Sequence, residues 1–139
     1  MKTKHIILAE DDEDDRLLFV DFINNRNDIQ LQYIAENGME VLGYLASIKE
    51  PANFPDLIVL DQNMPKMNGS QTLDALKADK RLSEIPVAIY TTYSDKTLTR
   101  ESHDAGVVLV IEKPVTLSGY HQMMDQFVAM MDNIRGTKK

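Results

Sequence analysis

Short apolar runs alternate along the chain with longer segments in which apolar residues recur every three or four positions. The strand-like runs lie at residues 5–9, 29–35, 57–60, 86–90 and 107–111. Segments of helical period lie at 14–26, 38–49, 69–80, 95–105 and 117–134. Strands that alternate with helices are typical of βαβ units, and nearly continuous apolar runs indicate strands buried on both faces. The pattern therefore predicts an α/β domain with a parallel sheet.

Right-handed crossovers between parallel strands place helices on both faces of the sheet, so we expect a doubly wound sandwich. The last segment is the clearest helix because its apolar residues form one stripe. The members of this stripe are Leu117, Tyr120, Met124, Phe127 and Met131. We expect the stripe, with its methionines, to be part of the core.

Composition narrows the class of protein. A chain of 139 residues fits one domain, here with a core at about 4–134 and a short tail at 135–139. The absence of cysteine excludes disulfides, thiolate zinc sites and a cysteine nucleophile. No apolar run approaches the roughly 20 residues of a membrane helix. The apolar run at the N-terminus is too short to be the core of a secretory signal. We therefore expect a cytoplasmic protein. A net charge of -7 without a basic stripe argues against direct binding of nucleic acid.

Chemically capable side chains follow the apolar runs. Ligands of doubly wound folds bind beyond the carboxyl ends of the strands, so these positions are the place to look for a site. The residues concerned are the acidic run Glu10 to Asp15 after the first strand, Asp61 after the third, Thr91 after the fourth and Lys113 after the fifth. We interpret the later acids of the run, 12–15, mainly as helix N-terminal residues, where negative charge is favoured.

Glu10, Asp11 and Asp61 should converge if the first and third strands are neighbours. Carboxylates that close together repel one another and need a compensating cation. An all-oxygen cluster suits a hard cation such as Mg²⁺. With the ammonium of Lys113 and the hydroxyl of Thr91 nearby, this set has the equipment for phosphoryl transfer, with Asp61 as the nucleophile.

Four separate motifs resemble those of response-regulator receiver domains. They are Ile7-Leu8-Ala9-Glu10-Asp11-Asp12, the stretch from Pro55 through Asp61 to Gly69, Pro86-Val87-Ala88-Ile89-Tyr90-Thr91, and Ala105-Gly106 through Lys113-Pro114. They occur in the order and spacing of that family, and the resemblance covers residues 4–134. It implies a flavodoxin-like (βα)5 domain with strand order 2-1-3-4-5, of the stand-alone, chemotaxis type.

The resemblance also implies roles for individual residues. Asp61 matches the phosphoacceptor, which takes a phosphoryl group from a sensor histidine kinase or a histidine phosphotransfer protein. Asp11 matches the direct ligand of Mg²⁺ (or Mn²⁺) and Glu10 a ligand acting mostly through water, with Asp61 and the backbone carbonyl of Asn63 completing the protein ligands. Thr91 matches the switch hydroxyl, and Lys113 the ammonium that pairs with the phosphoryl group.

The family resemblance further assigns the output surface to the helix at 95–105, the strand at 107–111 and the helix at 117–134. The helix at 95–105 has little apolar stripe, so it should be the least firmly packed, although a plain surface helix is the competing interpretation. The resemblance implies a cis Lys113–Pro114 bond. From the short apolar runs and the acidic balance we expect no membrane partner and no direct contact with nucleic acid.

Two positions depart from the family pattern. Val110 stands where many receivers have a tyrosine or phenylalanine that swings inward on activation, which puts aromatic coupling in doubt. Thr92 stands where a small residue is usual, and Tyr93 follows it. We hypothesise that Tyr93 and Asn63 help to set the rate of dephosphorylation.

Other functions remain open. Two outputs fit the same domain: an end effector of a pathway, or a phosphorelay shuttle to another histidine phosphotransfer protein. A small phosphatase with an aspartyl intermediate would want an acid two residues after its nucleophile, where this chain has Asn63. A flavin-binding domain of similar topology would need a phosphate loop after the first strand, where the acids 10–15 would repel phosphate. We expect no attached output domain, since the receiver pattern uses nearly the whole chain.

Overall fold

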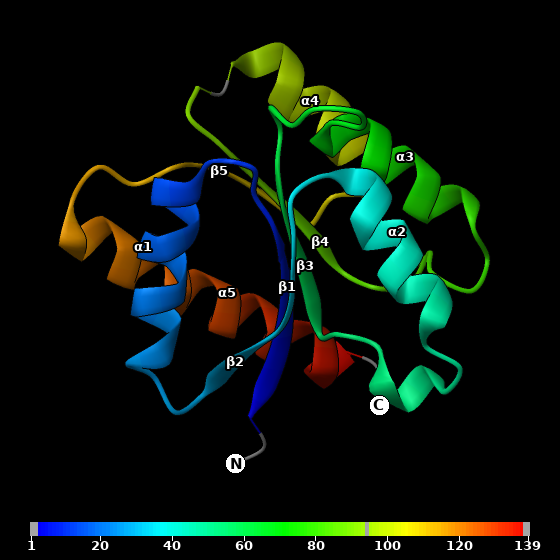
Figure 1. Ribbon diagram of the computed structural model, residues 1–139, viewed down its shortest axis with the longest axis horizontal. Coiled ribbons are helices and arrows are strands. Elements are labelled where there is room, and N and C mark those ends of the chain that lie inside the picture. The colour runs from blue at the N-terminus through cyan, green and yellow to red at the C-terminus, as the bar shows by residue number, and fades with distance from the viewer. Residues whose placement is uncertain (1–2, 94, 138–139) are drawn as a thin grey trace.

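Five parallel strands form a central sheet with helices on both faces (Figure 1). The computed structural model describes residues 3–93 and 95–137. The strands are β1 (Lys4–Ala9), β2 (Ile29–Ala35), β3 (Leu57–Asp61), β4 (Val87–Thr91) and β5 (Leu109–Glu112). The helices are α1 (Glu13–Asn24), α2 (Gly38–Ser47), α3 (Gly69–Ala78), α4 (Lys96–Asp104) and α5 (Leu117–Thr137), with a 3₁₀ turn at Pro51–Asn53. The strand order β2-β1-β3-β4-β5 confirms the predicted topology.

The ends of several elements differ from the sequence-based expectation. Helix α2 ends two residues early because Ile48 is extended and Pro51 follows, and proline cannot continue a helix. Strand β5 begins at Leu109 rather than at 107. Helix α5 continues to Thr137 through most of the segment expected to be a tail, and residues 138–139 lie outside the described part of the chain.

Two apolar clusters fill the space on either side of the sheet. Alternate residues of a strand point to opposite faces, so Ile7 and Ile58 pack under α2 and α3, whereas Ile6 and Leu57 pack under α1 and α5. All the residues of β3 are buried, as expected for a central strand covered on both faces. The sheet is thereby held as a rigid platform for the residues that follow its strands.

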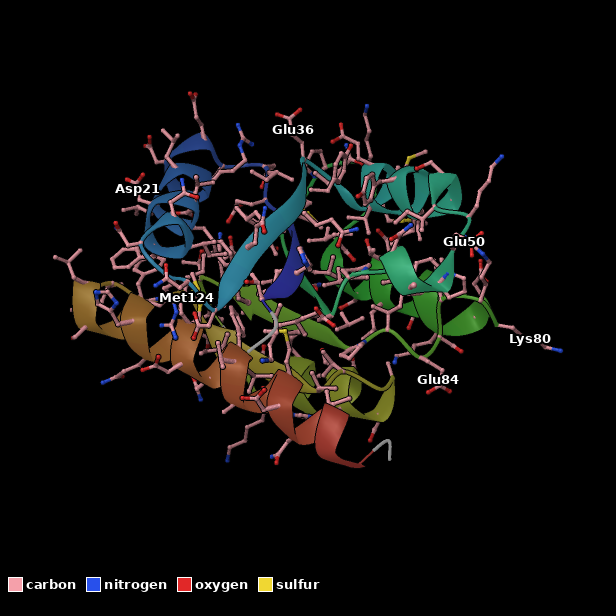
Figure 2. The ribbon with its side chains drawn as sticks, turned by 90° about the horizontal axis from the view of Figure 1, so that it is seen from below. Asp21, Glu36, Glu50, Lys80, Glu84 and Met124 are labelled. Carbon is pink, nitrogen blue, oxygen red and sulfur yellow. The ribbon has the colours of Figure 1, made fainter. Side chains whose placement is uncertain are left out.

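The predicted stripe of α5 is buried except at its first position. Tyr120, Met124, Phe127 and Met131 are core residues, and Met124 lies between α1 and α5 in Figure 2. The prediction for Leu117 was wrong, because this residue opens the helix beyond the sheet and is 69% exposed. Charged side chains extend outward from the surface, among them Asp21, Glu36, Glu50, Lys80 and Glu84 (Figure 2).

Polar caps fix the start of each of the first four helices just beyond a strand. Asp12 caps α1 by accepting a hydrogen bond from the backbone N–H of Asp15 at 3.0 Å, and Asn37 and Asp95 act in the same way for α2 and α4. Asn68 and Gln71 form a reciprocal capping box at α3. Helix N-termini and strand carboxyl ends consequently share one edge of the molecule, the upper edge in Figure 1.

Candidate phosphoacceptor and metal site

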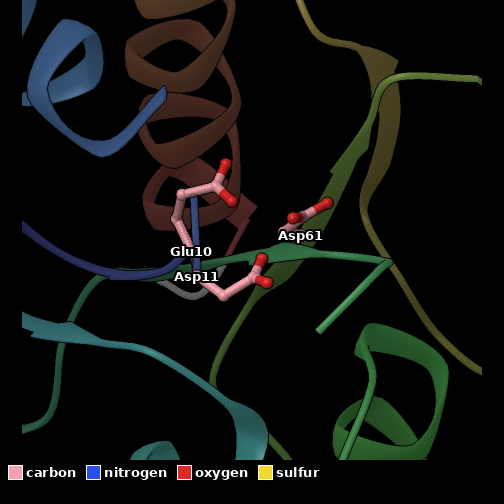
Figure 3. A group of neighbouring side chains, drawn as sticks. All are labelled: Glu10, Asp11 and Asp61. Carbon is pink, nitrogen blue, oxygen red and sulfur yellow. The ribbon is translucent and has the colours of Figure 1, made fainter. Parts of the chain in front are cut away.

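Three carboxylates meet at this edge. Ala9 of β1 pairs with Leu60 of β3, which sets the residues that follow, Glu10 and Asp61, beside each other. One carboxylate oxygen from each of Glu10, Asp11 and Asp61 lies within 4.8 Å of the other two (Figure 3). Glu10 and Asp61 are buried, whereas Asp11 is exposed to solvent. The group therefore has a fixed inner wall and one side open to an incoming ion or phosphodonor.

Lys113 supplies the positive charge of the site. Its Nζ lies 2.8 Å from Glu10 Oε1, 2.9 Å from Asp15 Oδ2 and 3.3 Å from Asp61 Oδ2. The backbone of Lys113 is held as well, because its N–H donates to the carbonyl of Thr91 at 2.7 Å. The lysine thus follows β5 in register with the end of β4, and its side chain reaches across the end of β4 to Asp61 of β3 and to Glu10, which follows β1.

Thr91 ends β4 and is 1% exposed. Its hydroxyl donates to the carbonyl oxygen of Tyr93 at 3.3 Å, within the loop that leads to α4. The hydroxyl is therefore engaged with the loop, and a rotation about the threonine side chain would be needed to bring it to a group on Asp61.

The loop after β3 wraps closely around Asp61. The N–H of Asn63 donates to Asp61 Oδ1 at 3.3 Å, and the side chain of Asn63 is exposed. Gly69, the first residue of α3, donates its N–H to the carbonyl of Gln62 at 3.1 Å. A Cβ at position 69 would lie 2.8 Å from the carbonyl oxygen of Asp61, so only glycine permits this approach.

The pKa values of the two buried acids, Glu10 and Asp61, are shifted in opposite directions. The pKa of Asp61 is raised to about 7, first by burial and then by the hydrogen bond and the negative charge of Glu10, while the charge of Lys113 opposes the increase. Burial also disfavours the charge on Glu10, but hydrogen bonds from Asp61, Lys113, Tyr90 and the N–H of Asp12 leave its pKa below the usual value. Glu10 is therefore the ionised partner, and Asp61 takes up a proton first when no metal is bound.

The donor set suits a hard divalent cation. Three carboxylates, with neither histidine nor cysteine among the ligand atoms, are the hard oxygen ligands that Mg²⁺ and Mn²⁺ prefer. A cation would replace the proton on Asp61 and offset the repulsion among the three acids. Lys113 supplies only one positive charge, which is too little to neutralise them.

Sequence reasoning missed two residues of the site. Asp15 was expected only to favour the start of α1, yet it forms an ion pair with Lys113. Asp11 precedes the N-cap of α1, so helical spacing gave no signal that would have placed Asp15 in the site. Tyr90 was expected only as part of an apolar strand, yet its hydroxyl donates to Glu10 Oε1 at 2.5 Å.

The expected cis bond before Pro114 was wrong: the described residues contain no cis peptide bond. The trans form is also the intrinsically favoured one, by about 0.5–1 kcal/mol for a bond that precedes proline. Val110, at the position of the missing aromatic residue, is partly buried and packs against the cluster beneath α2 and α3.

Comparisons with known proteins agree with this geometry. The family model for the response regulator receiver domain matches residues 6–125. The phosphorylated cyanobacterial phytochrome response regulator RcpA is 32% identical, with a TM-score of 0.78 over 91% of both chains. The Mn²⁺-bound response regulator Rcp1 is 28% identical, with a TM-score of 0.75 over 88% of this chain and 90% of the other.

Curated relatives include proteins of different lengths. A protein-glutamate methylesterase/protein-glutamine glutaminase of Clostridium acetobutylicum is 31% identical over 92% of this chain, but the match spans only 36% of that protein. The similar protein of Moorella thermoacetica is 32% identical over 78% of this chain and matched over 24% of its own length. The polar-differentiation response regulator DivK of Brucella ovis is 25% identical over 91% of this chain and 97% of its own length.

The chain belongs to the response regulator receiver domain family of two-component signalling. Its acidic cluster suits both Mg²⁺ binding and phosphorylation of an aspartate. Among the described residues, no helix combines the length and apolar character needed to span a bilayer.

Proposed function

We propose that Asp61 accepts a phosphoryl group from a phosphohistidine of a sensor kinase or of a histidine phosphotransfer protein, in a reaction that depends on Mg²⁺ or Mn²⁺. One observation carries the proposal. Asp61 lies 3.3 Å from the ammonium of Lys113 and within 4.8 Å of the ligand oxygens of Glu10 and Asp11, and it differs from Glu10, whose two oxygens already accept hydrogen bonds from Tyr90 and from the N–H of Asp12. A nucleophile, a cation site and a fixed positive charge are the components that phosphoryl transfer requires.

In the reaction, a carboxylate oxygen of Asp61 attacks phosphorus as the bond from phosphorus to the imidazole nitrogen breaks. The electron pair of that bond stays on the imidazole. Lys113 pairs with the oxygens of the transferred group, and Thr91 turns toward them once they are on Asp61. Asp11, Glu10 through water, Asp61 and the carbonyl of Asn63 would hold the metal ion, which supplies charge neutralisation when bound.

Two relatives support this assignment. RcpA has been crystallised in a phosphorylated form and Rcp1 with Mn²⁺, and both resemble this chain over nearly its full length. We place the reaction in the cytoplasm, where a kinase has access to ATP.

The output is proposed to be a contact with a downstream protein through α4, β5 and α5. Helix α4 is suited to move because Ser102 is its only buried residue. The loop between Thr91 and α4 links this helix directly to the phosphorylation site. A role as a phosphorelay shuttle is the second candidate, and it needs the same site with a different acceptor. A phosphatase role is less favoured, since such an enzyme would want an acid two residues after its nucleophile, and this position holds the exposed Asn63.

Phosphotransfer from candidate kinases, and from acetyl phosphate, tests the proposal. Wild type should be labelled in the presence of Mg²⁺, and Asp61→Asn should not. Asp14→Asn, which removes an exposed acid of the same run, is the matched control and should be labelled normally. Equal labelling of Asp61→Asn would overturn the assignment of the acceptor. Return of the label to an added histidine phosphotransfer protein would identify a shuttle.

A further inference from the structure

Tyr90 occupies an unusual place for an aromatic residue of the core. It lies on the face of β4 covered by α1 and α5 and is 1% exposed. Its ring packs edge-on against Phe19, with 5.7 Å between centroids. Its hydroxyl points out of this apolar cluster to the carboxylate of Glu10, 2.5 Å away. The residue therefore joins the core to the acidic site.

The contact determines how Glu10 is held. Glu10 is fully buried, and each of its carboxylate oxygens has a donor. Oε2 accepts from the N–H of Asp12 at 3.1 Å, while Oε1 is shared between Tyr90 and Lys113. Without the tyrosine hydroxyl, Lys113 would be the remaining donor to Oε1, although it also serves Asp15 and Asp61.

The ring of Tyr90 acts on the lysine as well. Nζ of Lys113 lies 5.0 Å from the centroid of the ring, within the range of a cation–π interaction. The two contacts fix the acid and the ammonium relative to one rigid, buried side chain. A phenylalanine would fill the core equally well and keep the ring contacts, so the hydroxyl is the part of the residue that serves the site.

We propose that Tyr90 is a positioning residue, which orients Glu10 for metal binding and keeps Lys113 free to pair with the group on Asp61. The inference rests on the proposed function, because it concerns the metal site assigned there. Groups that orient metal ligands typically contribute 10- to 100-fold in metal affinity.

Titration of the full chain with Mn²⁺, followed by calorimetry or water-proton relaxation, tests this role. Tyr90→Phe should bind Mn²⁺ about tenfold or more weakly than wild type. Phosphorylation by acetyl phosphate should then need more Mg²⁺, but it should recover most of its rate at saturating Mg²⁺. Tyr120→Phe is the matched control, since it is a buried tyrosine of the same cluster that stacks on Phe22, and its affinity should stay within about twofold of wild type.

A double mutant separates positioning from general stability. If Tyr90 acts through Glu10, adding Tyr90→Phe to Glu10→Gln should change Mn²⁺ affinity no further. Unchanged affinity of Tyr90→Phe, or an equal loss in both backgrounds, would overturn the role of Tyr90 alone. A wild-type chain that binds no Mn²⁺ would overturn the proposed metal site, and the role of Tyr90 with it.

A second readout needs no substitution at position 90. In the chain labelled with fluorotyrosine, Mg²⁺ should shift the ¹⁹F resonance of a buried tyrosine, and this shift should persist in Tyr120→Phe. Absence of any shift among the buried tyrosines during Mg²⁺ binding would contradict the proposal, even if Tyr90→Phe does not fold.

Discussion

The ammonium of Lys113 lies closer to Asp15 than to Asp61: Nζ is 2.9 Å from Asp15 Oδ2 and 3.3 Å from Asp61 Oδ2. The lysine that we assign to the phosphoryl group is thus shared with an acid of α1. Asp15 is partly exposed, whereas Asp61 is nearly fully buried. In this state the ion pair with Asp15 competes with the pairing that phosphorylation requires.

Removing this competition should speed phosphorylation. In Asp15→Asn the ammonium loses one negative partner and the edge loses a charge that repels an anionic phosphodonor. We expect labelling by acetyl phosphate to be about two- to fivefold faster, in line with the 0–1 kcal/mol typical of partly exposed ion pairs. The initial rate at fixed Mg²⁺ is the measurement.

Asp14→Asn removes the neighbouring charge without touching Lys113 and serves as the control. An equal acceleration in both variants would point to the general field of the acidic run. Slower labelling of Asp15→Asn would show that Asp15 helps to hold Lys113 in place.

The buried Asp61 should make stability depend on pH in the absence of metal. Its pKa of about 7 lies above the value of 3.8 for an unperturbed aspartate. The folded state then binds more protons than the unfolded state between about pH 4 and 7, so this group's contribution to the free energy of unfolding falls as pH rises through that window. Asp61→Asn removes the effect and keeps a donor for Glu10. At pH 8 we expect the variant to be more stable than wild type by roughly 1–4 kcal/mol.

Urea unfolding at pH 5 and pH 8 in a chelator measures the difference. The advantage of Asp61→Asn should shrink at the lower pH, and a difference independent of pH would contradict the assignment. Added Mg²⁺ should raise the stability of wild type more than that of the variant. The ion binds the folded state and not the unfolded chain, and only the wild-type site has all three carboxylates.

Helix α4 should report phosphorylation through Thr91. Ser102 is the only buried residue of α4, and its hydroxyl has no hydrogen-bond partner among the residues that the structure describes, so little holds the helix in place. With an acyl-phosphate mimic on Asp61, we expect hydrogen exchange in α4 to change in wild type. In Thr91→Ala the change should disappear although the mimic still binds. No change in wild type would favour a plain surface helix.

Tyr93 should affect the lifetime of the acyl phosphate. It follows the switch position by two residues, its carbonyl oxygen accepts the hydrogen bond of the Thr91 hydroxyl, and its side chain is 73% exposed. Tyr93→Ala should change the rate of dephosphorylation about two- to tenfold, a change of up to about 1.4 kcal/mol in the barrier, by altering the access of water. Decay of labelled protein after removal of the donor gives the rate. An unchanged lifetime would remove this role.

The sequence by itself determined the architecture. The strands at the centre of the sheet are short, nearly continuous apolar runs, and the helices between them begin at polar caps, so local pattern and global fold agree. The acids after the first and third strands and the lysine after the fifth could be placed together because parallel strands all end at one edge. The family resemblance then supplied the strand order.

Only the tertiary structure decided which side chains share each charge. Asp15 belongs to the site because α1 turns it toward Lys113, and Tyr90 belongs to it because the register of β4 aims its hydroxyl at Glu10. In the tertiary structure, Leu117 is also exposed and the bond before Pro114 is trans. These outcomes depend on contacts between residues as many as 98 positions apart, and the local periodicity that reveals strands and helices contains no information about such contacts.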